Sequence, residues 1–91
     1  MHDNIDIITR KIKMRGASRE EIAEYFRGLS KYIHDDKRFY GTDWVVELGD
    51  EKPCVLGSIM LMEVDITFSA SRECLEALLA DFRLKFMRAG G

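Results

Sequence analysis

The strongest constraint on the fold is a regular alternation of apolar and polar residues in the second half of the chain. Every second position of this stretch is apolar, at Met60, Met62, Val64, Ile66 and Phe68. Between Met62 and Phe68 the intervening positions are polar, at Glu63, Asp65 and Thr67. Successive side chains of a strand point to opposite faces of a sheet. The pattern therefore predicts a strand with one buried face and one hydrated face, which is typical of an antiparallel sheet.

A second alternating strand is predicted near the N-terminus, from Ile5 to Arg15. From Ile8 onward its even positions are apolar except for Arg10, and its odd positions carry Thr9, Lys11, Lys13 and Arg15. We expect Glu63 and Asp65 to lie across the sheet from these cations and to pair with them. Arg10 stands on the apolar face, so it is a candidate for binding an anion or a partner's carboxylate at the sheet rim.

Two segments have the period of a helix. Ser18 and Glu21 have the spacing of a capping box, and the apolar stripe behind them predicts a helix from about Arg19 to Ile33. The second helix is predicted to follow a cap at residues 69–71. Its buried stripe is Leu75, Leu78, Leu79, Phe82 and Phe86.

The middle of the chain is predicted to contain a loop at residues 34–43, a strand at 44–48, a turn at 49–53 and a long strand at 54–68. Gly57 and Ser58 leave three alternatives for that long strand, namely a bulge, a bend or a break into two strands. The predicted fold is a single α+β domain over residues 1–91, in the order strand, helix, strand, strand, helix. We expect a two-layer sandwich in which two helices cover one face of a three- to four-stranded, mainly antiparallel sheet, in a ferredoxin-like arrangement that lacks its last strand.

Composition argues against several classes of protein. The chain has 14 Lys plus Arg and 16 Asp plus Glu, a net charge of −2, without the basic excess of a nucleic-acid binder. It has no apolar run of about 20 residues and no recognisable signal peptide. We therefore expect a cytoplasmic protein without a membrane partner, and Cys54 and Cys74 as free thiols.

Catalytic and metal-binding patterns are missing from the sequence. The two histidines, His2 and His34, lie beside aspartates but have no metal-ligand spacing. Neither cysteine has a histidine nearby in the sequence to serve as a base. The sequence thus predicts no cofactor, no metal site and no enzymatic activity.

Three aromatic residues lie in or beside the predicted loop, at Phe39, Tyr40 and Trp44. An exposed aromatic cluster would be a protein-binding surface. The alternative is that these rings close the open end of the core.

The chain ends in Gly90 and Gly91. Here it resembles the ubiquitin-like sulfur carriers, whose Gly-Gly tail threads into an activating enzyme that adenylates the terminal carboxylate and converts it to a thiocarboxylate. The alternative is that these glycines only terminate a helix.

The half of the chain from Arg38-Phe39-Tyr40-Gly41 to the end resembles the accessory domain that follows the sulfur-carrier domain in some bacterial MoaD-related proteins. The resemblance implies a link to molybdopterin or sulfur-transfer metabolism through a partner protein, and no enzymatic activity. Our leading interpretation is a bacterial accessory or protein-interaction domain that binds another protein, or a second copy of itself, through its exposed sheet face and aromatic loop. The alternatives are a sulfur-carrier-like protein and, by analogy of fold, a regulatory domain that binds a small ligand.

Overall fold

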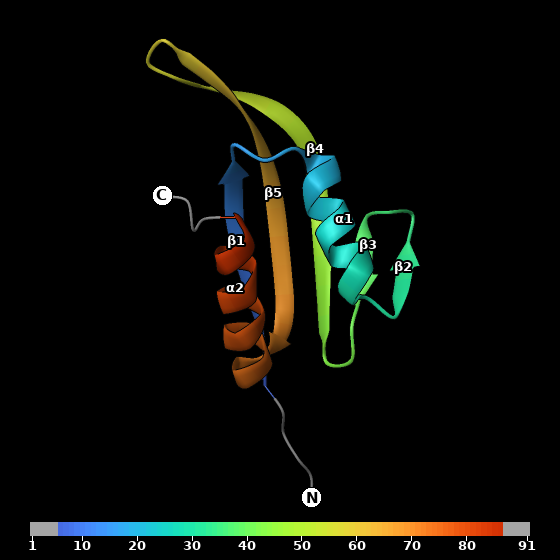
Figure 1. The fold of residues 1–91 in the computed structure, drawn as a ribbon. Coiled ribbons are helices and arrows are strands. Elements are labelled where there is room, and N and C mark those ends of the chain that lie inside the picture. The colour runs from blue at the N-terminus through green and yellow to red at the C-terminus, as the bar shows by residue number, and fades with distance from the viewer. Residues whose placement is uncertain (1–5, 87–91) are drawn as a thin grey trace, which may run out of the picture.

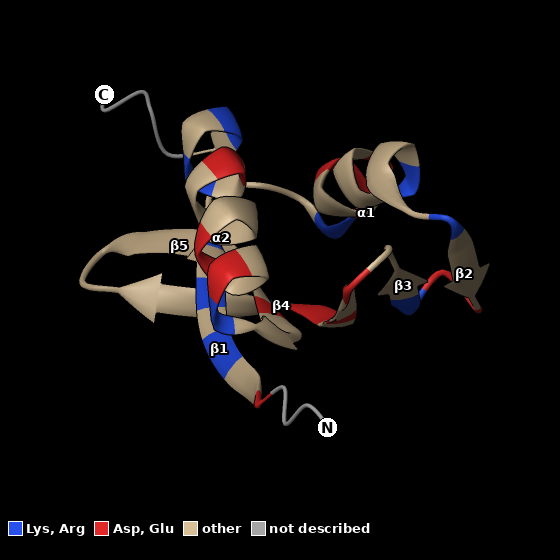
Figure 2. Ribbon diagram, turned by 90° about the horizontal axis from the view of Figure 1, so that it is seen from below, with Lys and Arg blue, Asp and Glu red and all other residues tan. Residues whose placement is uncertain are grey.

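The computed structural model describes residues 6–86, which form five strands and two helices. The elements are β1 (Ile7–Arg15), α1 (Arg19–Leu29), β2 (Tyr32–His34), β3 (Arg38–Tyr40), β4 (Trp44–Leu56), β5 (Ile59–Ser71) and α2 (Arg72–Phe86). The strands form one antiparallel sheet in the order β1-β5-β4-β3-β2. Both helices lie on the same side of this sheet (Figures 1 and 2). The predicted α+β class is confirmed. The predicted count of three to four strands is wrong, because the short strands β2 and β3 are added between α1 and β4. The strand order therefore differs in detail from the expected ferredoxin-like arrangement.

Helix α1 begins as predicted and ends earlier. The Ser18 hydroxyl accepts a hydrogen bond from the Glu21 backbone N–H at 3.1 Å, and the Ser18 N–H donates to Glu21 Oε1 at 2.9 Å. The helix ends at Leu29 rather than Ile33, because Tyr32 and Ile33 belong to strand β2. Neither helix of the described chain is long and apolar enough to cross a membrane.

Residues 34–43 contain a short hairpin instead of the predicted loop. The Lys37 N–H donates to the His34 carbonyl at 2.9 Å, and Asp35 and Asp36 between them both have a φ of 54°. Two central residues with positive φ make the tight turn that matches the twist of paired strands. Strands β2 and β3 can therefore pair directly, with Ile33 opposite Phe39.

The predicted turn at residues 49–53 is also wrong. Strand β4 continues to Leu56, with only a register shift between Leu48 and Glu51. The Gly49 carbonyl in this bulge accepts a hydrogen bond from Arg19 Nε at 2.9 Å, and Glu51 Oε1 accepts from the Arg19 backbone N–H at 2.8 Å. Arg19, the first residue of α1, therefore holds the bulge in place. The chain does not turn back at residues 49–53.

The reversal occurs at Gly57 and Ser58, where Gly57 has a φ of +64°. Leu56 pairs with Ile59 on either side, so the long predicted strand breaks into the end of β4 and the start of β5. At its other end β5 runs on to Ser71, through the segment that was predicted to cap the second helix. The result is a long hairpin that forms the middle of the sheet.

The core lies between the two helices and the sheet face beneath them. Phe26 of α1 is at its centre and is fully buried. Its ring centroid lies 5.8 Å from that of Phe82, 6.0 Å from Phe68 and 6.1 Å from Phe39. Aromatic pairs at these separations add to the stabilisation from buried area.

The tip of the β4–β5 hairpin projects beyond this core. The Met62 carbonyl still accepts a hydrogen bond from the Gly16 N–H at 3.3 Å. Beyond it, up to Leu56↔Ile59, the two strands pair only with each other, because the pairing of β1 stops at Glu63 and that of β3 at Glu47. We call residues 53–62 the arm; it extends from one end of a molecule that measures 55 × 26 × 18 Å (Figure 1). Met60 and Met62 were predicted to face the core, but they are 66% and 37% exposed because no helix covers the arm.

Candidate interaction surface

The sheet face opposite the helices has no second layer over it in the described structure, and we call it the open face. Directly opposed residues of neighbouring strands share a face. The register therefore places Lys11, Thr67 and Glu47 in one row across β1, β5 and β4, and Arg38 of β3 continues that row. Arg38 Nε lies 3.8 Å from Glu47 Oε1.

The next row pairs cations with an aspartate, as predicted. Lys13 is opposite Asp65 in the register, and its Nζ lies 3.3 Å from Asp65 Oδ1. Lys52 Nζ lies 3.4 Å from Asp65 Oδ2. The hydrogen bond from Lys13, helped by that from Lys52, holds the pKa of Asp65 below its ordinary value. The carboxylate therefore stays charged at neutral pH and neutralises part of the basic strand.

A third row lies at the base of the arm. Arg15 Nε donates to Glu63 Oε2 at 3.0 Å, and the Glu63 side chain is almost enclosed. Glu63 was predicted on the hydrated face; it lies on that face but is only 8% exposed, because Arg15 and Lys13 fold over it. The nearby Cys54 thiol is the largest cause of the raised pKa of Arg15, followed by Glu63. The Glu63 carboxylate is thus paired with cations of its own chain and is not available to a partner.

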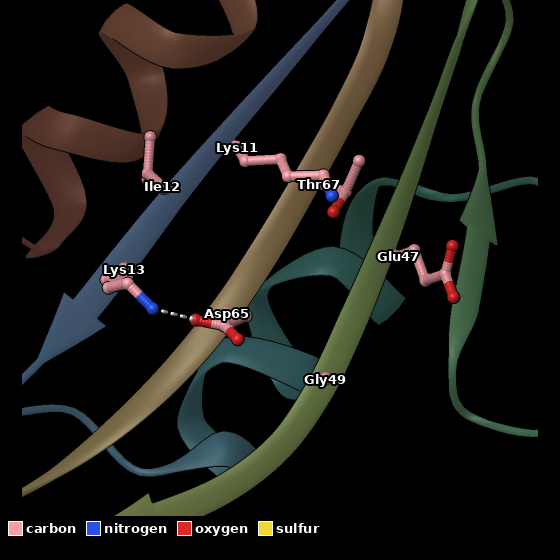
Figure 3. Close-up of a pocket in the computed structure, with 7 residues that line it drawn as sticks. All are labelled: Lys11, Ile12, Lys13, Glu47, Gly49, Asp65 and Thr67. Carbon is pink, nitrogen blue, oxygen red and sulfur yellow. Dashed lines mark hydrogen bonds and ion pairs between the residues drawn. The ribbon is translucent and has the colours of Figure 1, made fainter. Parts of the chain in front are cut away.

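The middle of the open face is shallowly concave, with a volume of about 660 Å³ (Figure 3). It is lined by Lys11, Ile12, Lys13, Glu47, Gly49, Asp65 and Thr67. Figure 3 shows the Lys11 ammonium group beside Thr67, and within residues 6–86 Lys11 forms no ion pair. The concavity therefore offers charged groups of both signs, with one ammonium group still available to a partner.

A second hollow lies at the end of the open face opposite the arm and has a volume of about 570 Å³. It is lined by Ile7, Tyr40, Gly41, Thr42, Asp43, Trp44, Val45, Ser69 and Ser71. We call it the apolar hollow, because Asp43 is its single charged residue. Beside it, the rings of Tyr32 and Tyr40 lie 5.5 Å apart.

The three aromatic residues predicted as one cluster are separated by the strands that carry them. Phe39 is fully buried and packs on Phe26, so its ring closes the core as in the alternative interpretation. Tyr40, the next residue, points to the open face. Trp44 lies opposite Ala70 on the helix side, half-buried, with its ring 6.2 Å from Phe26. The sequence interpretation did not identify Tyr32, because it fits the helical stripe of α1 and the short β2 equally well.

Arg10 lies where the alternation predicted it. It pairs with Phe68 in the register, so it is on the helix side, and it is exposed because β1 is an edge strand. Among residues 6–86 the Arg10 side chain forms no hydrogen bond or ion pair. Its role as an anion or carboxylate contact stays a prediction.

The structure also locates the residues that the sequence offered for catalysis or metal binding. Within residues 6–86 no group of three or more His, Cys, Asp or Glu residues could hold a metal ion. Cys54 and Cys74 are free thiols, and burial raises the pKa of Cys74. The side chain of His34 lies 3.4 Å from Asp35 on the surface. Gly90 and Gly91 lie outside the described residues.

Comparison with known proteins places the chain in a family. The model of a family described as "Archaeal MoaD-like protein" matches residues 10–91. The chain belongs to this family. The match confirms the relationship to MoaD-like proteins that the C-terminal half suggested, although the family is described as archaeal and the resemblance was to a bacterial accessory domain. Searches of curated proteins and of solved structures found no significant match to this MoaD-like chain.

Proposed function

We propose that this MoaD-like protein is a non-enzymatic accessory domain that binds another protein through the charged middle of its open face. The family relationship supports a place in molybdopterin or sulfur-transfer metabolism. The observation that carries the proposal is the five-stranded sheet face that neither helix covers, together with its ordered rows of charge.

Several features of the open face suit a protein partner. Its rows combine cations and carboxylates at fixed positions, so a complementary surface must present the opposite charges in register. Such complementarity favours specificity and fast association more than raw affinity. A nucleic acid would need basic residues without the interleaved Asp65 and Glu47. Lys11 is the natural anchor, since its ammonium group forms no ion pair among the described residues.

The test is affinity capture from native cells followed by titration of the purified partner. Three forms of the protein are compared: wild type, Lys11→Glu on the open face, and Lys85→Glu on α2 as a matched control. Both lysines are exposed, so neither change should affect folding. We expect a partner from sulfur-transfer or molybdopterin synthesis whose affinity falls at least about tenfold, or 1.4 kcal/mol, with Lys11→Glu only.

The proposal is wrong if both variants bind the partner as tightly as the wild type. It is also wrong if the purified protein alone turns over a metabolite.

A second candidate function is a sulfur carrier activated at its C-terminus. The observation that favours it is the family match, which extends through Gly90 and Gly91 to the last residue of the sequence. The test is the intact mass of untagged protein from native cells. A carrier should carry a mass increase equal to the replacement of one carboxylate oxygen by sulfur. Deletion of Gly91 should abolish function and leave the melting temperature unchanged; an unmodified terminus and a silent deletion would rule this function out.

A further inference from the structure

The arm is an unusual surface for a monomer. No charged residue lies between Lys52 and Glu63, although a third of the whole chain is charged. Its exposed apolar side chains are Val55 (67%), Leu56 (46%), Ile59 (59%), Met60 (66%) and Met62 (37%). The register places Val55, Met60 and Met62 on the helix side and Leu56 and Ile59 on the open side, so both faces of the arm are apolar. Exposed apolar surface of this kind marks an interaction site. Two-stranded hairpins are also marginally stable alone in water, so an arm of this kind is expected to be covered.

The same chain carries a surface of matching chemistry at its other end. The apolar hollow is uncharged apart from Asp43, and its wall includes Ile7, which is 63% exposed. Ile7 begins β1 and Trp44 begins β4, whereas the arm is made of the last residues of β4 and the first residues of β5, at the other end of the sheet (Figure 1). The molecule is 55 Å long, so an arm cannot reach the hollow of its own chain. It can reach the hollow of a second copy.

Charge excludes the other obvious routes to self-association. The free edge of β1 carries Arg10, Lys11, Lys13 and Arg15 (Figure 2), so pairing with a second β1 would place cation beside cation. The opposite edge strand, β2, has only three residues. A contact between the arm and the apolar hollow would place no cations side by side and would not depend on a short edge strand.

The area of the contact favours a reciprocal arrangement. Burying one aliphatic side chain completely removes roughly 60–120 Å² from water. The five side chains of the arm are 37–67% exposed, so they supply roughly 165–330 Å². A stable interface buries about 800 Å² on each partner. When each copy contributes both its arm and its hollow, the buried area approaches that value. A two-fold axis perpendicular to the strands brings the arm of each copy to the hollow of the other and closes the assembly.

We propose that two copies of this chain form a symmetric dimer in which the arm of each copy occupies the apolar hollow of the other. This proposal does not rest on the proposed function, because it is argued from the arm and the apolar hollow alone and Lys11 belongs to neither. Its partner is a second copy of the chain, chosen by apolar complementarity at opposite ends of the same molecule.

The test is sedimentation equilibrium of the full chain with three exposed-site variants. Ile59→Lys places a charge on the arm, Ile7→Lys places one in the hollow, and Leu84→Lys is the control on α2, where the side chain is 66% exposed. Circular dichroism confirms that each variant is folded. We expect the first two variants to weaken dimerisation at least about 100-fold, since symmetry places the lysine in both contacts. The Leu84→Lys control should dimerise like the wild type.

A mixing experiment separates this arrangement from its competitors. A heterodimer of the Ile59→Lys and Ile7→Lys chains keeps one unmodified arm–hollow contact, whereas each variant alone keeps none. The mixture should therefore associate more tightly than either variant alone. A monomeric wild type overturns the proposal, and so does a dimer that survives Ile7→Lys, which would indicate arm-to-arm packing. A mixture that associates no better than its components overturns it as well.

Discussion

The two halves of strand β5 have the same alternation of apolar and polar residues, but the apolar residues are buried in one half and exposed in the other. Val64, Ile66 and Phe68 are fully buried beneath the helices. Met60 and Met62 are in the same phase of the same strand, yet they are 66% and 37% exposed. The difference lies in what covers them, because α1 and α2 pack over the body of the sheet and stop before the arm (Figure 1). Alternation thus determines which face a side chain occupies, and a separate layer determines whether that face is buried.

This contrast has an energetic consequence. Full burial of a large apolar side chain stabilises a fold by about 1.5–3 kcal/mol relative to exposure. The body gains this contribution at most of its helix-side positions, and the isolated chain gains little of it in the arm. The folded body should therefore be insensitive to changes in the arm and highly sensitive to changes in its own core.

The largest expected effect comes from truncating the central ring of the body. Phe26→Ala removes a fully buried side chain that contacts Phe39, Phe68 and Phe82. We expect a loss of about 3–5 kcal/mol in the free energy of unfolding. Met60→Ala in the arm should change it by less than about 0.5 kcal/mol. Urea denaturation at low protein concentration, where the chain is monomeric, measures both; equal losses would mean that the arm belongs to the cooperative core.

Two glycines give a smaller contrast between the same regions. A Cβ added to Gly41 would overlap the indole ring of Trp44, so the indole must move. We expect Gly41→Ala to cost about 1–3 kcal/mol. Gly57 in the arm turn has free space around it, and its positive φ alone should make Gly57→Ala cost about 1 kcal/mol.

Trp44 fluorescence separates the two glycine changes. Its emission should shift with Gly41→Ala and stay constant with Gly57→Ala. An unshifted spectrum in both variants would contradict the close approach of Trp44 to Gly41.

The smallest expected effect concerns acid stability, which should depend on the body alone. Arg27 of α1 donates to Asp36 Oδ1 at 3.0 Å and Oδ2 at 2.9 Å, and to Glu20 at 3.0 and 3.2 Å. Hydrogen bonds from Arg27 hold the pKa values of Asp36 and Glu20 below their ordinary values. A lowered pKa stabilises the fold above the unfolded-state value of about 4, and that contribution is lost as the pH falls through the folded-state value.

We therefore expect the melting temperature of the wild type to fall below about pH 4 more steeply than that of Arg27→Gln. Arg83→Gln on the exposed surface of α2 serves as the control and should follow the wild type. Parallel pH profiles for all three proteins would show that the Arg27 contacts do not contribute.

Local patterns predicted the elements whose signals are short-range. The capping box of Ser18 and Glu21 located the start of α1, and alternation located β1 and the pairing of its cations with Asp65 and Glu63. The end of α1 was missed because Tyr32 and Ile33 satisfy both a helical and an alternating period. Tyr32 and Ile33 form a strand because they pair with Tyr40 and Phe39. The turn between the two strands contains Asp35 and Asp36, which both adopt positive φ.

The candidate surface was predicted in part for a similar reason. Arg10 and Tyr40 lie at the surface, as the sequence suggested, but Phe39 and Trp44 turn toward the core. Neighbouring residues of a strand point to opposite faces of the sheet. Because residues 34–43 were predicted to be a loop, the sequence did not indicate which face Phe39 and Tyr40 would occupy. Ile7 was not recognised because its place in the apolar hollow depends on strand order. Tyr32 was not recognised because its contact with Tyr40 depends on strand order as well.

The sequence by itself determined the two helices, the antiparallel character of the sheet, its hydrated charged face and the relationship to MoaD-like proteins. The helices, the antiparallel character and the charged face follow from local spacing, which a single segment contains in full, whereas the relationship rests on a resemblance of the C-terminal half. Only the tertiary structure decided that the chain reverses at Gly57, that the β4–β5 tip stands clear of both helices, and that an apolar hollow forms at the far end. Those features depend on which distant segments cover or pair with one another, and the free energy that decides between the alternatives comes from long-range contacts.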